Sequence, residues 1–153
     1  TLLTNPSLLT LIPLFSGESG SLISILGARL SSGLHSGLVE PLRKPEGEAL
    51  HNFAICFILA IIVFPFIGIL AESSSLMFGT MGIGFDKIIP ISTLSGIILV
   101  AIMVVVVYYI STVSYNHNLD PDNIVIPIST SVTDSISSLI LISVSLIIIG
   151  LFI

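Results

Sequence analysis

The sequence has very little charge. Only 8% of its 153 residues are Asp, Glu, Lys or Arg, whereas a soluble domain typically carries about 25%. Hydrophobic residues make up 54% of the chain and the mean hydropathy is +1.15. A water-soluble fold is therefore excluded, and residues 1–153 are predicted to form a single transmembrane domain, with the lipid bilayer as its surroundings.

Basic residues, cysteine and cofactor motifs are also scarce. The four cations are Arg29, Arg43, Lys44 and Lys87. Because they form no basic patch, nucleic acid is excluded as a partner. The lone Cys56 has no second cysteine with which to form an intrachain disulfide or a thiolate metal site. The sequence contains neither a His-Glu-x-x-His zinc motif nor a phosphate-binding loop, so no organic cofactor is expected.

Four long apolar segments dominate the chain, at about residues 7–28, 53–71, 88–115 and 124–153. A transmembrane β-barrel would need segments of about 10 residues with alternating polarity, and these runs are longer and continuous. The fold class predicted is an all-α integral membrane protein with about four transmembrane helices. Pro13, Gly17 and Gly20 in the first segment predict a broken or kinked helix.

The distribution of cations predicts the orientation in the cell membrane. The connection between the first two segments holds Arg43 and Lys44, and such loops tend to remain cytoplasmic. Alternation then places the second connection, from Glu72 to Lys87, outside, and the third, from Asn116 to Asn123, in the cytoplasm. The C-terminus is expected outside.

Two acidic residues are predicted at mid-membrane depth. Glu18 precedes Arg29, and Asp134 follows Asn123, by a separation of about 16 Å at a helical rise of about 1.5 Å per residue. The hydrocarbon core is about 30 Å thick, so both carboxylates are expected near its centre, on different helices. An ionised carboxylate at this depth marks an ion or proton pathway by default, since it needs a partner or water.

No lysine or arginine is expected inside the membrane to neutralise these acids, which leaves a bound cation, a proton or an aqueous cavity. Oxygen ligands suit hard cations such as Mg²⁺, which keeps several of its waters. Asp134 shares its predicted helix face with hydroxyl side chains at spacings of three and four, namely Thr130, Ser131, Ser137 and Ser138. The pattern predicts a divalent-cation path centred on Asp134.

Two stretches resemble a known family. The first runs from Pro13 through Gly17-Glu18-Ser19-Gly20 to Arg29 and His35, and the second runs from Leu119-Asp120-Pro121-Asp122-Asn123 to Asp134. Both are similar to signatures of the MgtE-type magnesium transporter membrane domain and its eukaryotic solute-carrier relatives. The resemblance implies that the four segments are the last four of five helices, so that a first helix precedes them, and that the transported ion is Mg²⁺.

The same resemblance implies a homodimer with a pore between its two membrane domains. Asp134 matches the pore aspartate, and Thr130 matches the position whose carbonyl lies one turn earlier. Glu18 and Ser21 stand where asparagines often occur, so the metal-site residues implied are Asp134, Thr130, Glu18 and Ser21. The cytosolic magnesium-sensing domains of the bacterial proteins have no counterpart in this sequence.

Two alternatives remain open. The stretch Gly17-Glu18-Ser19-Gly20 fits the Gly-x-Ser-Gly pattern of an intramembrane serine protease, although the three histidines are predicted in or beside loops, away from the serine. A structural membrane subunit that transports nothing is the other alternative. Small residues at a spacing of four, such as Ser92 and Gly96, would serve its helix contacts. The chain is otherwise expected not to be an enzyme.

Overall fold

The computed structural model describes residues 5–42 and 44–151, without the side chains of Asp122 and Leu151. These residues form four α-helices: α1 (Pro6–His35), α2 (Glu48–Met77), α3 (Phe85–Asn116) and α4 (Pro121–Leu151). All four are long and apolar enough to cross a membrane. The predicted all-α membrane fold is confirmed. Arg43 and residues 152–153, which close the last predicted segment, lie outside the described residues.

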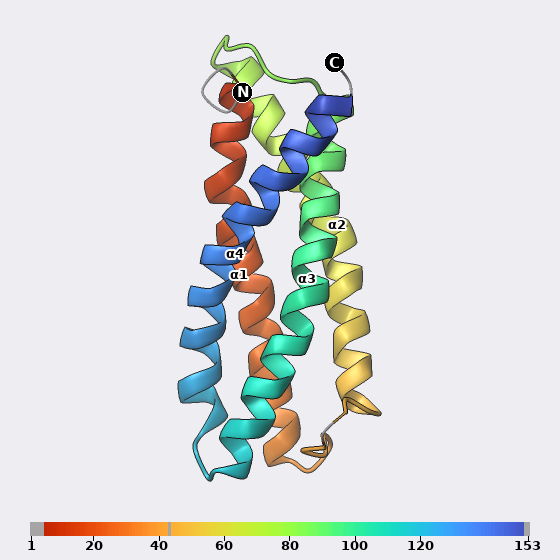
Figure 1. Cartoon of the computed structure of the whole chain (residues 1–153), viewed down its shortest axis with the longest axis vertical. Coiled ribbons are helices and arrows are strands. Elements are labelled where there is room, and N and C mark those ends of the chain that lie inside the picture. The colour runs from red at the N-terminus through yellow and green to blue at the C-terminus, as the bar shows by residue number, and fades with distance from the viewer. Residues whose placement is uncertain (1–4, 43, 152–153) are drawn as a thin grey trace.

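The four helices form an antiparallel bundle (Figure 1). The α1–α2 connection and the α3–α4 turn lie at one end, and the α2–α3 connection lies at the other, with the start of α1 and the end of α4. Helix α1 packs against all three other helices, and α3 packs against both α2 and α4. Helices α1 and α4, which carry Glu18 and Asp134, therefore pack against each other.

The helices extend beyond the apolar runs seen in the sequence. A helix of 30 residues, such as α1 or α2, is about 45 Å long, so its ends project from a hydrocarbon core of about 30 Å. The predicted break in the first segment is wrong, because α1 is continuous through Pro13, Gly17 and Gly20. Membrane helices tolerate an internal proline when neighbouring groups satisfy the freed carbonyl.

Close packing between α2 and α3 depends on glycine. The rings of Phe15 and Phe64 lie 4.9 Å apart between α1 and α2, and Phe64 also presses on Gly96 of α3. A Cβ atom built on Gly96 would lie 1.9 Å from a ring carbon of Phe64. The side chain of Phe64 is fully buried, so the ring has no free space into which to move.

Replacing Gly96 with alanine is therefore expected to destabilise the bundle by about 1–3 kcal/mol, the usual cost of an added methyl group in a packed core. The thermal midpoint in detergent, followed by fluorescence-detected size exclusion, should fall clearly. Gly150→Ala is the matched control, because nothing lies within 4 Å of its added Cβ. Equal midpoints for the two variants would contradict the close contact with Phe64.

Glu72 was predicted to begin the loop after the second apolar segment, and this loop assignment is wrong. Glu72 lies inside α2 with only 2% of its surface exposed. Its Oε1 accepts a hydrogen bond of 2.8 Å from the backbone N–H of Gly84, while Oε2 has no hydrogen-bond partner among the described residues. A Cβ on Gly82 would overlap the same carboxyl group. Glu72 thus fastens the α2–α3 connection onto the end of the bundle.

Candidate ion site

A polar strip runs along α4 on the outside of the protomer. Asp134 lies near the midpoint of α4, and its side chain is exposed. Ser131 and Ser135 are also exposed, while Thr130 and Ser138 are half-buried. In a helix that is otherwise rich in Ile, Leu and Val, these residues form a hydrophilic surface at membrane depth. We call this set, Thr130, Ser131, Asp134, Ser135 and Ser138, the α4 polar face.

The carboxylate of Asp134 is held against α1 by hydroxyl groups. Ser16 Oγ donates a hydrogen bond of 3.0 Å to Asp134 Oδ1, and Ser137 Oγ lies 3.3 Å from Ser16 Oγ. A Cβ on Gly20 would lie 3.7 Å from Asp134 Oδ1, so α1 passes close to the carboxylate at this level. Asp134 forms no ion pair with any residue in 5–42 or 44–151.

Glu18 and Asp134 do not meet within one protomer. Ser16 and Gly20 are the α1 residues nearest Asp134, and Glu18 lies two positions from each. Residues two apart on an α-helix point to nearly opposite sides. The exposed Glu18 side chain therefore points away from α4. The two acids share a level in the bundle but not a site in the single chain.

The hydroxyl groups of Ser21 and Thr130 bond to their own helices. Ser21 Oγ donates to the carbonyl of Gly17 at 3.0 Å, and Thr130 Oγ1 donates to the carbonyl of Ile126 at 2.9 Å. A hydroxyl that donates its hydrogen in this way still presents oxygen lone pairs outward. Both residues can therefore serve as oxygen acceptors for a cation or its water.

A single protomer does not enclose a metal ion with acidic side chains. Within the described part of the chain, no three His, Cys, Asp or Glu residues come together in a metal-binding group. Asp134 with the hydroxyls of Ser16 and Ser137 supplies one face of an oxygen-rich site. This arrangement suits a cation that keeps most of its water shell or that is shared with another molecule.

Comparison with known protein families identifies the family to which the chain belongs. The MgtE family, described as divalent cation transporters, matches residues 12–144, which is most of the chain. The chain belongs to the MgtE family. The matched region contains Glu18, Ser21, Thr130 and Asp134. No curated protein and no solved structure matches the chain.

Membership of the MgtE family makes this domain part of a divalent cation transporter embedded in a membrane. The positions of Ser19 and the histidines also argue against the protease alternative. Ser19 is buried, and its Oγ donates to the carbonyl of Phe15 at 2.6 Å. The three histidines lie at the ends of helices, at the end of the bundle that carries the α1–α2 connection: His35, His51 and His117. None of them can act as a base for Ser19.

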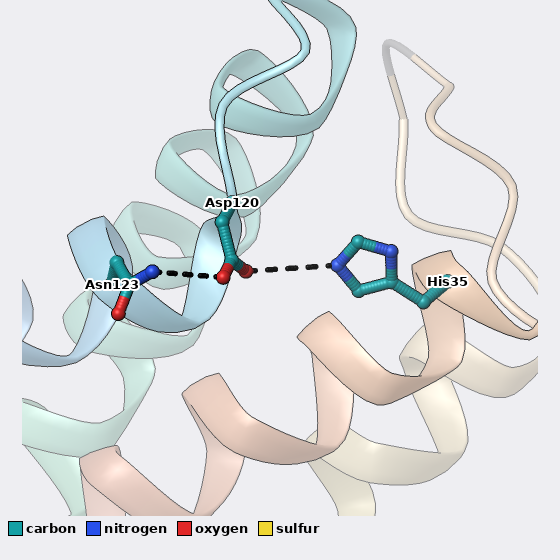
Figure 2. Close-up of polar contacts among 3 residues, drawn as sticks. All are labelled: His35, Asp120 and Asn123. Atoms are coloured by element: carbon teal, nitrogen blue, oxygen red, sulfur yellow. Dashed lines mark hydrogen bonds and ion pairs between the residues drawn. The ribbon is translucent and has the colours of Figure 1, made fainter.

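A second acidic position of this MgtE-family domain lies where α1 ends and α4 begins (Figure 2). Asp120 Oδ2 accepts a 2.8 Å hydrogen bond from Asn123 Nδ2, and Asp120 Oδ1 lies 3.7 Å from His35 Nε2. Asp120 belongs to the third connection predicted from the sequence. It does lie half-exposed to solvent, but it also connects α1 to α4 below the α4 polar face. Nothing in the short Asp-Pro sequence predicted this contact with α1.

Proposed function

We propose that this domain conducts Mg²⁺ across the membrane along the surface formed by α1 and the α4 polar face. One observation carries the proposal: the exposed carboxylate of Asp134 lies near the centre of a membrane-spanning helix and has no cationic partner among the described residues. Leaving such a charge in contact with lipid costs at least about 2.5 kcal/mol. A passing divalent cation with its water removes this cost.

The ligand chemistry favours Mg²⁺ as the cargo. The hydrogen-bonding side chains beside the Asp134 carboxylate are the hydroxyls of Ser16 and Ser137, and each offers an oxygen atom. Mg²⁺ binds through few direct carboxylates and retains several waters, whereas softer metals favour thiolate or imidazole ligands. Neither a cysteine nor a histidine lies on the α4 polar face. A site with one carboxylate per chain fits this preference.

The exposed polar face also supports a homodimer. Ser131, Asp134 and Ser135 face outward from the protomer, and a polar surface at this depth is stable when it lines a water-filled space or contacts another protein. A second copy related by a two-fold axis would bring two Asp134 carboxylates to one central path. Their combined charge matches that of one divalent cation.

The other metal-site residues would then have distinct roles. Thr130 lies one turn from Asp134 on α4 and would offer its oxygen atoms to the waters of the ion. Ser21 and Glu18 lie on the exposed side of α1, from which they would contact the path in the assembled dimer. In this arrangement the α1–α2 connection faces the cytoplasm, where Lys44 is favoured.

Purified protein in liposomes that contain a magnesium-sensitive dye tests the proposal. Mg²⁺ added outside is expected to enter, and an inside-negative potential should speed entry, because each charge gains about 2.3 kcal/mol per 100 mV. The same vesicles without protein provide the baseline. Protein-containing vesicles with no influx above this baseline, with or without a potential, would refute Mg²⁺ conduction.

Cysteine cross-linking tests the proposed dimer contact. In a Cys56→Ser background, Ser131→Cys, Ser135→Cys and Ser138→Cys are expected to include at least one variant that oxidises to a disulfide-linked dimer in membranes. A disulfide requires Cα atoms within about 7 Å of each other. Ile62→Cys is the control, since Ile62 is an exposed apolar residue of α2. If Ile62→Cys forms the dimer and none of the three α4 variants does, the proposed contact through the α4 polar face is contradicted.

A further inference from the structure

A cavity with charged and apolar walls opens between α1 and α2 at the end of the bundle that carries their connection. Its volume is about 360 Å³. One wall is formed by Arg29 and Ser32 of α1 and by Ser36, which caps that helix, and α2 contributes Glu48 and Asn52. These α1 residues lie on one helix face at spacings of three and four, and so do the two α2 residues. The cavity thus has a cationic wall and an anionic wall.

Arg29 anchors the deep side of this cavity. Its Nε donates a 2.6 Å hydrogen bond to Oδ1 of Asn52, and Asn52 is itself 4% exposed. Across residues 5–42 and 44–151, Arg29 has no carboxylate within ion-pairing distance. The guanidinium is therefore oriented by a neutral amide and retains unpaired N–H donors. A planar guanidinium held in this way is well suited to bind a phosphate oxygen pair.

A narrow and shallow apolar groove, with a volume of only about 10 Å³, continues from the cavity along α1 and α2 toward the middle of the bundle. Arg29 and Asn52 line both spaces, and beyond them the walls are apolar: Leu22, Ile25 and Leu26 on α1, and Ile55, Cys56 and Leu59 on α2. Ile25 is 51% exposed, so the groove is open on its outer side. Arg29, whose guanidinium can bind a phosphate, therefore lies where the cavity and the apolar groove meet.

We propose that this α1–α2 site binds a phospholipid with an ammonium head group, of the phosphatidylethanolamine type. The phosphate would lie on Arg29, the ammonium would reach Glu48, and one acyl chain would follow the apolar groove. A zwitterionic head group matches one cation and one carboxylate better than a purely anionic head group does. A primary ammonium can also donate hydrogen bonds to Glu48 and Ser36, which a quaternary ammonium cannot.

The surroundings of the cavity agree with a position at the membrane surface. Leu38, which lines the cavity, is 71% exposed, and Leu42 and Leu50 nearby in the chain are also exposed. Pockets with a basic residue between transmembrane helices, at the level of the head groups, are typical of lipid sites. The site lies on the α1–α2 side, away from the Ser16 and Asp134 contact between α1 and α4. On α1 its groove begins at Leu22, which directly follows Ser21, the last α1 residue assigned to the proposed ion path.

Native mass spectrometry of the delipidated protein, with added phosphatidylethanolamine or phosphatidylglycerol of identical chains, tests the proposal. Wild type is expected to retain more phosphatidylethanolamine. Arg29→Gln should weaken retention of both lipids by about tenfold, the loss expected for a charge-assisted hydrogen bond. Glu48→Gln should remove the preference between them. Lys44→Gln is the control, because Lys44 is a cation outside the cavity wall.

Three further arms make the result decisive. Ile25→Ser should weaken lipid retention without changing head-group preference, and Arg29→Lys, which keeps the charge, should retain more lipid than Arg29→Gln. O-phosphoethanolamine without acyl chains should not compete. Equal retention by Arg29→Gln and Lys44→Gln, or full competition by the soluble phosphate, would overturn the proposal. Asp134→Asn should bind lipid as wild type does, so a failure of Mg²⁺ conduction would leave this result unaffected.

Discussion

Replacing Asp134 with asparagine is expected to lower divalent-cation flux in proteoliposomes by at least about tenfold, the equivalent of about 1.4 kcal/mol in the barrier. The side chain keeps nearly the same shape and can still accept the hydrogen bond from Ser16. It loses the negative charge that offsets the cost of bringing a cation to mid-membrane. Asp134→Glu keeps the charge and should retain a larger part of the flux than Asp134→Asn.

The matched control for this prediction is Asp86→Asn. Asp86 is an exposed aspartate in the first turn of α3, away from the α1–α4 surface. The Mg²⁺ flux through the Asp86→Asn variant should stay close to that of wild type. If Asp134→Asn and Asp86→Asn conduct Mg²⁺ equally, the Asp134 carboxylate is not part of the path.

Glu72→Lys should produce the largest loss of stability, at least about 3 kcal/mol, as expected when a buried charge is left uncompensated. Glu72 is 2% exposed and accepts the backbone N–H of Gly84. A lysine side chain cannot accept that hydrogen bond, so both the new ammonium and the Gly84 N–H would lack partners. The thermal midpoint in detergent and the yield of monodisperse protein should both fall sharply.

Glu72→Gln separates charge from hydrogen bonding at this position. Its side-chain carbonyl can still accept from Gly84, so the loss of stability should stay within about 1 kcal/mol. Glu40→Lys introduces the same charge change at an exposed loop residue and should be nearly neutral. A Glu72→Lys variant as stable as Glu40→Lys would mean that the carboxyl group does not fasten the α2–α3 connection.

The number of helices and the position of Asp134 near the middle of the last helix could be predicted from the sequence, because bilayer thickness and helical rise set the length of a membrane-spanning helix. Uninterrupted apolar runs predict α2 and α3. The Asp-Pro turn predicts the start of α4, and the number of residues from that start gives the position of Asp134 along the helix. The family resemblance drawn from residues 13–35 and 119–134 is confirmed by the match over residues 12–144.

Side-chain direction and the true helix ends could not be predicted in this way. The family resemblance implied one metal site for Glu18 and Asp134. The direction of a side chain around α1 depends on how the neighbouring helices pack, and within one protomer α4 contacts Ser16 and Gly20 instead. Glu72 was assigned to a loop because the first charged residue after the apolar run was taken to mark the end of the membrane-spanning segment. Its burial depends on the fold of the Gly82–Gly84 segment over it, which is a tertiary contact without a local signal.

The most direct test of the central claim is a structure of the assembled protein in lipid, determined with Mn²⁺ in place of Mg²⁺ and with anomalous scattering to locate the metal. We predict a metal peak between two copies of the α4 polar face, either bound directly to an Asp134 carboxylate at about 2 Å or one water layer away. A peak elsewhere, with both Asp134 side chains packed dry against protein or turned toward acyl chains, would contradict the account.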